Sequence, residues 1–117
     1  MGLTINVLGY ALDALGQSEQ VSAGNVANDQ TPGYTAKTYN FDTALQAAMS
    51  SGGTSTVTPT EGLSPAPAGT DGNNVNLAQQ LTNLSKDEVQ TQAVSDALST
   101  QFMILGDAMG ASGGGTL

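Results

Sequence analysis

The chain has 117 residues with no cysteine and no histidine, and ten acidic residues against two lysines give a formal net charge of −8. Nucleic acids and anionic membrane surfaces require clustered Lys and Arg, so both are excluded as partners. Without imidazole and thiol side chains the common catalytic bases, nucleophiles and soft metal ligands are missing. We therefore expect no enzyme, no cofactor and no metal site.

The N-terminal part predicts an amphipathic helix over residues 3–30. Its apolar residues recur at alternating steps of three and four, which is a heptad seam that needs a partner helix. The segment has no basic n-region, so we expect neither a secretory signal nor a membrane span. Its glycines either weaken the helix or let a neighbour approach closely, and the sequence leaves both readings open. The seam consists of Ile5, Leu8, Leu12, Leu15, Glu19, Ser22 and Val26.

Residues 31–49 predict a turn followed by an extended and a short helical segment. In the Thr-Pro-Gly-Tyr sequence at 31–34, the proline fixes φ at the second position and the glycine supplies a positive φ at the third. That combination is typical of a type II turn. A residue before proline is pushed out of the α region, so the first helix must end at or before Thr31.

Residues 50–72 form a connector in which Gly, Pro, Ser and Thr predominate. Such a composition cannot bury enough apolar surface to order itself, and it predicts a loop or a disordered segment. The last residues, 111–117, are also Gly-rich and predict a flexible tail.

Residues 73–110 predict a second, longer helix, which Asn74 or Asn76 can cap. Asp87 and Glu88 are adjacent and diverge around a helix, so we interpret them as a solvated patch rather than an acid and base pair. This helix carries a second heptad seam, made of Leu77, Leu81, Leu84, Glu88, Thr91, Ser95, Leu98, Phe102, Leu105 and Met109.

Two matching seams predict a mainly α fold. The long N- and C-terminal helices should pair as an antiparallel, coiled-coil-like hairpin, with an irregular or extended and partly disordered middle segment. In such a hairpin the polar interruptions of the two seams should roughly face each other. Outside the low-complexity parts little apolar surface remains, so we expect the isolated chain to be loose and to need partners. The interruptions are Glu19 and Ser22 in one seam and Glu88, Thr91 and Ser95 in the other.

Two stretches of the chain resemble the bacterial flagellar rod and hook proteins. Residues 25–34, Asn-Val-Ala-Asn-Asp-Gln-Thr-Pro-Gly-Tyr, are similar to the family signature N-I-A-N-x-x-T-P-G-Y, and residues 71–77 are similar to the proximal rod subunits. The chain departs from that pattern at Gln79 and Gln80, where acidic residues are usual. The motif positions are Asn25, Ala27, Asn28, Thr31, Pro32, Gly33 and Tyr34 in the turn motif, and Asp71, Gly72, Asn73, Asn74 and Val75 in the helix-entry motif.

The resemblance implies a structural subunit of the flagellar basal-body rod, which polymerises through helix packing into a hollow shaft in the periplasmic space. Its partners would be copies of itself, other rod subunits, the basal-body base and the type III export apparatus, without direct membrane insertion. The apolar residues of both seams would make the assembly contacts. Two alternatives stay open: another rod or hook axial subunit, and a secreted coiled-coil interaction module, which would not need the turn motif.

Overall fold

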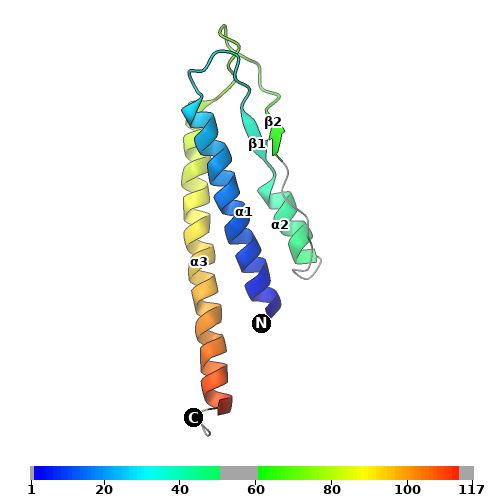
Figure 1. The fold of residues 1–117 in the computed structure, drawn as a ribbon, viewed down its shortest axis with the longest axis vertical. Helices are drawn as coiled ribbons and strands as arrows, with labels where there is room; N and C mark the ends of the chain where they lie inside the picture. The colour runs from blue at the N-terminus through cyan, green and yellow to red at the C-terminus, as the bar shows by residue number, and fades with distance from the viewer. Residues whose placement is uncertain (1, 51–60, 114–117) are drawn as a thin grey trace.

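The computed structural model describes residues 2–50 and 61–113. Along the chain it contains α1 (Gly2–Ala27), β1 (Lys37–Tyr39), α2 (Phe41–Ser50), β2 (Glu61–Leu63) and α3 (Leu77–Gly113). α1 and α3 run antiparallel side by side, and α2 lies on the opposite side of α1 (Figure 1). The molecule is elongated, with extents of 71 × 24 × 14 Å. The predicted hairpin of long N- and C-terminal helices with an irregular middle segment is confirmed.

α1 ends at Ala27, although the sequence predicted a helix to residue 30. The Asn28 side chain closes the last turn, because its Nδ2 donates to Gly24 O at 2.8 Å. The Asn28 backbone N–H also donates to Gly24 O, at 3.2 Å, and to Asn25 O, at 3.1 Å. The last carbonyl groups of a helix need such partners, and here the next residue supplies them.

The glycines of α1 do not serve close packing within the single chain. A Cβ atom built on Gly9, Gly16 or Gly24 would meet no other atom within 4 Å. Of the two readings that the sequence left open, close approach to α3 or α2 is therefore excluded. Two readings remain: α1 merely tolerates these glycines, or they allow contact with another molecule.

α3 begins at Leu77, four residues after the predicted start at 73. Asn76 caps it, since the Gln79 N–H donates to Asn76 Oδ1 at 3.1 Å. Asn74, the other predicted cap, is used elsewhere, as described below. At its far end α3 continues to Gly113, beyond the predicted residue 110, and the last four residues of the predicted tail lie outside the described residues.

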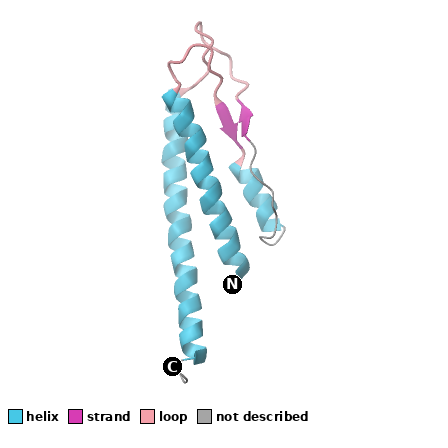
Figure 2. Cartoon of the chain, in the orientation of Figure 1, coloured by secondary structure: helices cyan, strands magenta, loops and turns pink. Residues whose placement is uncertain are grey.

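A two-stranded antiparallel sheet connects the loops to α2 (Figure 2). β2 belongs to the region predicted as a connector, of which residues 51–60 lie outside the described residues. A Cβ on Gly62 would come within 2.9 Å of Thr38 Oγ1, so a side chain at position 62 would require the Thr38 side chain to move. The register pairs Lys37 with Leu63, Thr38 with Gly62 and Tyr39 with Glu61.

The core lies along α1, which packs against α3 on one side and α2 on the other. Its buried residues are Ala11, Ala14, Leu15 and Phe41, and Tyr10, Tyr39, Leu45 and Val94 pack against them. Small alanine side chains let α1 approach its neighbours, but they bury little apolar area each. The Tyr39 hydroxyl donates to Gln17 Oε1 at 3.0 Å. Burial, followed by the nearby Tyr10, Asp13 and Glu61, raises the pKa of Tyr39 from 10.0 to about 12.

The stripe that α3 turns toward α1 differs in part from the predicted seam. Gln80 and Asp87 are buried and Val94 packs on the core, one residue before the predicted positions 81, 88 and 95. The predicted positions 84, 91, 98 and 105 are half-buried and belong to the same stripe. The predicted seam and the observed stripe both alternate steps of three and four residues, and they share these positions. Periodicity alone therefore could not show which of the two faces α1.

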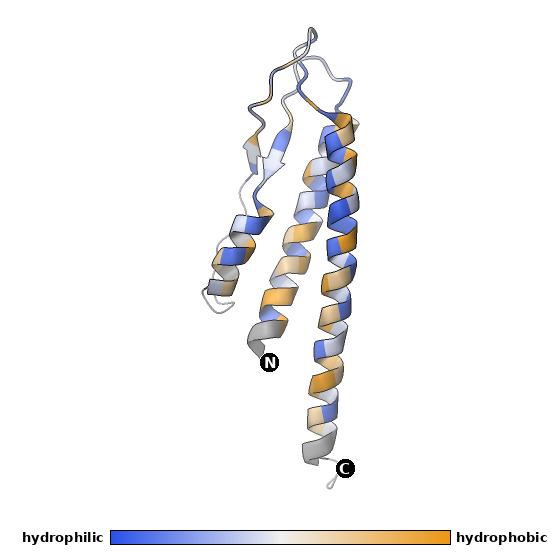
Figure 3. Ribbon diagram, turned by 180° about the vertical axis from the view of Figure 1, so that it is seen from behind, coloured by the Kyte–Doolittle hydropathy of each residue, from blue (hydrophilic) through white to orange (hydrophobic). Residues whose placement is uncertain are grey.

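Four large apolar residues of the predicted α3 seam are exposed, and so is Glu88. Leu81, Phe102 and Met109 are 49%, 54% and 63% exposed, and Leu77 is also exposed. On α1 the predicted residues lie inward: Leu15 is fully buried, and Ile5, Leu8, Leu12 and Val26 are half-buried. Seen from behind, apolar and polar residues alternate along α3 (Figure 3).

Candidate functional site: the motif junction

The turn motif (25–34) and the helix-entry motif (71–77) meet at the closed end of the hairpin, and we call this contact the motif junction. Asn73, which is buried, holds the two together. Its Nδ2 donates to Asn28 O and to Thr31 O, both at 2.8 Å. Its Oδ1 accepts from the Val75 N–H at 2.8 Å. One side chain therefore satisfies backbone groups on both sides of the contact, which would otherwise be costly to bury.

Asn25 is the centre of the polar network and is 0% exposed. Its Nδ2 donates to Lys37 O and to Gln80 Oε1, each at 2.9 Å. Its Oδ1 accepts from the Lys37 N–H at 2.9 Å and from the Tyr34 hydroxyl at 3.3 Å. An amide has two N–H hydrogens and two oxygen lone pairs, so Asn25 is fully satisfied. It connects α1, β1 and α3 through these four bonds.

Asn74 performs a similar role for the loop before α3. Its Oδ1 accepts from the Ala36 N–H at 2.6 Å, and its Nδ2 donates to Ser64 O at 3.1 Å and Ala66 O at 3.0 Å. The Asn74 N–H also donates to Tyr34 O at 3.2 Å. The described part of the connector is therefore tied to the motif junction, and Ser64 has a defined conformation.

Two glycines form the tightest backbone contact of the motif junction. The Gly33 N–H donates to Asp71 O at 2.8 Å, and a Cβ on Gly72 would lie 3.2 Å from the Gly33 Cα. Both glycines have positive φ, 75° and 80° respectively. The Tyr34 N–H donates to Thr31 O at 3.2 Å, as expected for the predicted type II turn. Neither position accepts a side chain without strain.

The remaining motif residues are placed at the edge of the motif junction. Ala27 and Pro32 are exposed, and Val75 is half-buried. The Thr31 hydroxyl donates to Asn28 Oδ1 at 3.1 Å, and Asp71 Oδ1 accepts from the Asn73 N–H at 3.1 Å. The two motifs, some 40 residues apart in the printed sequence, thus form one connected set of hydrogen bonds.

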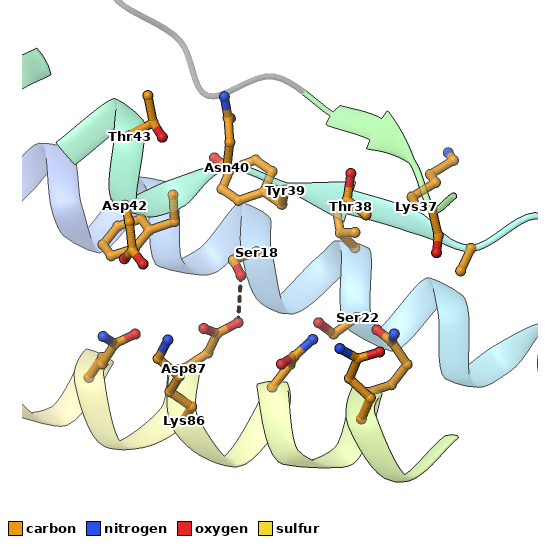
Figure 4. Close-up of a pocket in the computed structure, with 18 of the residues that line it drawn as sticks. Ser18, Ser22, Lys37, Thr38, Tyr39, Asn40, Asp42, Thr43, Lys86 and Asp87 are labelled. Carbon is orange, nitrogen blue, oxygen red and sulfur yellow. Dashed lines mark hydrogen bonds between the residues drawn. The ribbon is translucent and has the colours of Figure 1, made fainter. Parts of the chain in front are cut away.

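A polar groove of about 530 Å³ runs below the motif junction between α1, α3 and the β1–α2 segment (Figure 4). Asp87 lies in its wall, 6% exposed, and accepts a hydrogen bond from the Ser18 hydroxyl at 2.6 Å. The interpretation of Asp87 as solvated is therefore wrong, whereas Glu88 is exposed. Two of the polar interruptions that were predicted to face each other are in contact: the Thr91 hydroxyl donates to Glu19 Oε1 at 3.3 Å.

These polar pairs set the register of the hairpin. Going from Asn25 to Ser18 to Ala11 along α1, and from Gln80 to Asp87 to Val94 along α3, each step is seven residues. Asn25 bonds Gln80, Ser18 bonds Asp87, and Val94 packs on the cluster that contains Ala11. Sequence reasoning missed this set because it followed the leucines, yet the seven-residue spacing of polar residues was a usable signal.

Among the residues that the structure describes, the acidic side chains around the site do not gather into a metal-binding cluster. Within them, no group of three or more Asp and Glu side chains could hold an ion. Every buried side-chain nitrogen and oxygen atom of this part of the chain has a hydrogen-bond partner. No helix in residues 2–50 and 61–113 is long and apolar enough to span a membrane. The chemistry of the motif junction is structural: it holds backbone segments in place.

No protein-family model matches this sequence. The flagellar basal body rod protein FlgB of Escherichia coli (strain K12) is 31% identical over 113 residues, covering 79% of this chain and 82% of that protein. The chain belongs to the FlgB family. FlgB of Shigella flexneri matches to the same extent. Within this FlgB family member, Gln80 departs from the acidic residues expected there, and the structure shows that it bonds Asn25 inside the chain.

Proposed function

We propose that this chain is a structural subunit of the proximal rod of the bacterial flagellar basal body and that it polymerises through helix packing. Its membership of the FlgB family supports the rod role. The main support for polymerisation is the apolar surface of α3, where Leu81, Phe102 and Met109 are about half or more exposed in the single chain. Phe102, Met103 and Met109 lie within eight residues of one another on α3, and an exposed apolar patch of this kind marks an interaction surface.

The unequal length of the two long helices supports the same proposal. At about 1.5 Å per residue, the 37 residues of α3 span about 55 Å and the 26 residues of α1 about 39 Å. The C-terminal end of α3 extends beyond the N-terminus of α1 (Figure 1). Met103, Ile104 and Met109 are exposed in this part. A helix of another subunit would bury them.

We assign the motif junction a positioning role in this assembly. By bonding β1 and α3 together, Asn25 sets how the β1–β2–α2 arm lies against the hairpin. A polymer needs subunits of one shape, because a variable angle in each copy would accumulate along the rod. Residues of the two motifs would therefore affect assembly without touching a neighbour.

The route and location are part of the proposal. The family resemblance supports delivery through the flagellar type III export apparatus and a place in the periplasmic part of the rod, with other rod subunits and the basal-body base as neighbours. The small alanine-rich core supports a chain that is easily kept unfolded for passage. No catalytic role is proposed.

Complementation tests the proposal. In a bacterium whose own gene for this subunit is deleted, the wild-type chain should restore swimming and isolated basal bodies should contain it in the rod. Replacing both Leu81 and Phe102 with Ser should abolish swimming, whereas Thr82→Ser, at an exposed polar neighbour, should not. A stable soluble dimer, with no incorporation into basal bodies, would instead support a secreted coiled-coil module. Incorporation elsewhere along the axis would support another rod or hook subunit.

A further inference from the structure

The motif junction contains a chemically reactive pair. Asp71-Gly72 is the one position in the chain where glycine follows Asp or Asn. Both residues are exposed to water. In unfolded peptides such a pair rearranges spontaneously, because glycine has no side chain to hinder attack by its backbone nitrogen on the preceding carboxyl group. Every other Asp and Asn of the sequence is followed by a residue with a side chain.

We propose that Asp71 is a site of isoaspartate formation that is silent while the motif junction is closed and reactive when it is open. The Gly72 amide nitrogen forms a bond to Asp71 Cγ. The N–H proton and the hydroxyl of the protonated carboxyl group leave as water, which gives a cyclic imide. Water then adds to one of the two imide carbonyls. One opening restores aspartate, and the other leaves the main chain running through Cγ, which is isoaspartate.

The closed motif junction opposes the first step directly. The Gly72 N–H donates to Gly69 O at 3.0 Å, and the imide nitrogen carries no hydrogen, so ring closure must destroy this bond. Asp71 Oδ1 is held by the Asn73 N–H at 3.1 Å. Asp71 O accepts from the Gly33 N–H at 2.8 Å, and the ring restricts the backbone rotation that positions this oxygen. Ring closure should therefore be slow while these three bonds are in place.

Once formed, isoaspartate prevents the motif junction from closing again. It inserts a methylene group into the main chain between Asp71 and Gly72. The former carbonyl of Asp71, which accepted the Gly33 N–H, becomes a free carboxylate on a branch. Asn73 then lies at the wrong distance for its two bonds of 2.8 Å to Asn28 O and Thr31 O. This reaction does not depend on the proposed rod function.

The test compares rates of isoaspartate formation in the full chain. Wild-type protein is incubated at one pH and temperature, in buffer that contains an osmolyte favouring compact states and in concentrated urea. Isoaspartate at position 71 is measured by peptide mapping and by methyl transfer from labelled S-adenosylmethionine with a protein isoaspartyl methyltransferase. We expect formation in urea to be several-fold faster. Equal rates in buffer and in urea would overturn the proposed protection.

Two variants connect the rate to the motif junction. Asn73→Ala removes the bonds to Asn28 O and Thr31 O, so its rate in buffer should approach the rate in urea, while its rate in urea matches wild type. Asn6→Ala changes an exposed residue of α1 far along the chain and should behave as wild type in both. A wild-type rate for Asn73→Ala in buffer would contradict the mechanism. Purified isoaspartyl protein should also show less helix by circular dichroism than its parent, and unchanged helix content would refute the effect on closure.

Discussion

The side chain of Asn25 pairs with the backbone of Lys37 as a neighbouring strand would. It donates to Lys37 O and accepts from the Lys37 N–H, each at 2.9 Å. β2 occupies the other edge of β1, so an amide from a helix completes the pairing of a three-residue strand. A two-stranded ribbon is marginally stable alone in water. Hydrogen bonds to α1 through Asn25, and from Tyr39 to Gln17, hold this one in place.

Asn25→Asp should therefore open the motif junction. A carboxylate cannot donate, so Lys37 O and Gln80 Oε1 lose their bonds in a buried place, at a cost of about 3 kcal/mol in the free energy of unfolding. Thermal melts followed by far-UV circular dichroism, in an osmolyte that favours compact states, would measure the loss. The same replacement at the exposed Asn6 supplies the charge control. Equal melts for the two variants would show that Asn25 is not central.

Gly33→Ala should destabilise the chain, whereas Gly16→Ala should stabilise it. Gly33 has φ of 75°, where a Cβ costs about 1 to 2 kcal/mol. Gly16 lies within α1 with open space around its Cβ position, so alanine there should add up to about 1 kcal/mol. The same thermal melts would compare both. If Gly16→Ala raises stability but abolishes swimming, the glycine serves contact with another subunit rather than mere tolerance.

The double replacement Glu19→Leu with Thr91→Leu should make a more stable hairpin that assembles less well. The two side chains meet at 3.3 Å between α1 and α3, and two leucines there would bury apolar area worth about 2 kcal/mol or more. Glu88→Leu, at an exposed position on the same helix, is the control and should leave the melting curve unchanged. Normal swimming of the more stable double variant would show that the polar contact is not needed for assembly.

Stability should fall between about pH 10 and pH 12 because of Tyr39. Its pKa is raised from 10.0 to about 12 in the folded chain, so folding favours the protonated phenol. This contribution is complete below pH 10 and is lost as pH rises through the folded pKa. Tyr39→Phe should remove that part of the pH dependence, and the ultraviolet absorbance of tyrosinate would follow the titration directly. A Tyr39 titration near its ordinary value would contradict the buried environment.

The purified monomer should be mostly fluctuating helix that gains order on assembly. Only Leu15 and Phe41 are large among its four buried core residues, and Phe102 on α3 is 54% exposed in the single chain. Far-UV circular dichroism over a range of concentrations would test this, and helix content should rise with association. A fully helical monomer that melts cooperatively at micromolar concentration would contradict it.

Local features of this fold could be predicted from the amino-acid order. Heptad spacing predicted α1 and α3, because a helix repeats its facing positions over short distances along the chain. The proline and glycine at 32–33 predicted the turn, because each acts on its own backbone torsion. The Asn76 cap was among the predicted ones for the same reason. Each of these predictions depends on neighbours within a few residues.

The choice between Asp87 and Glu88 as the inward residue needed the tertiary structure. Both continue an alternation of three and four steps along α3, and the leucines favoured the stripe that contains Glu88. The other stripe faces α1 because Asp87 bonds Ser18 and Gln80 bonds Asn25. These partners are some 70 and 55 residues away in the sequence. A buried hydrogen bond contributes to stability only when both partners are buried against each other, because an unpaired buried group is destabilising. The sequence alone does not show which partners meet.

The motif junction was likewise decided in three dimensions. The sequence identified both motifs but not that Asn73 and Asn74 join them, nor that part of the connector is ordered against them. Asn side chains cap helices, close turns and bridge backbones with similar geometry, so local context leaves their roles open. The role of each Asn is fixed only when the two segments, some 40 residues apart in the chain, come together. Their backbone oxygens then accept the hydrogen bonds of the Asn side chains.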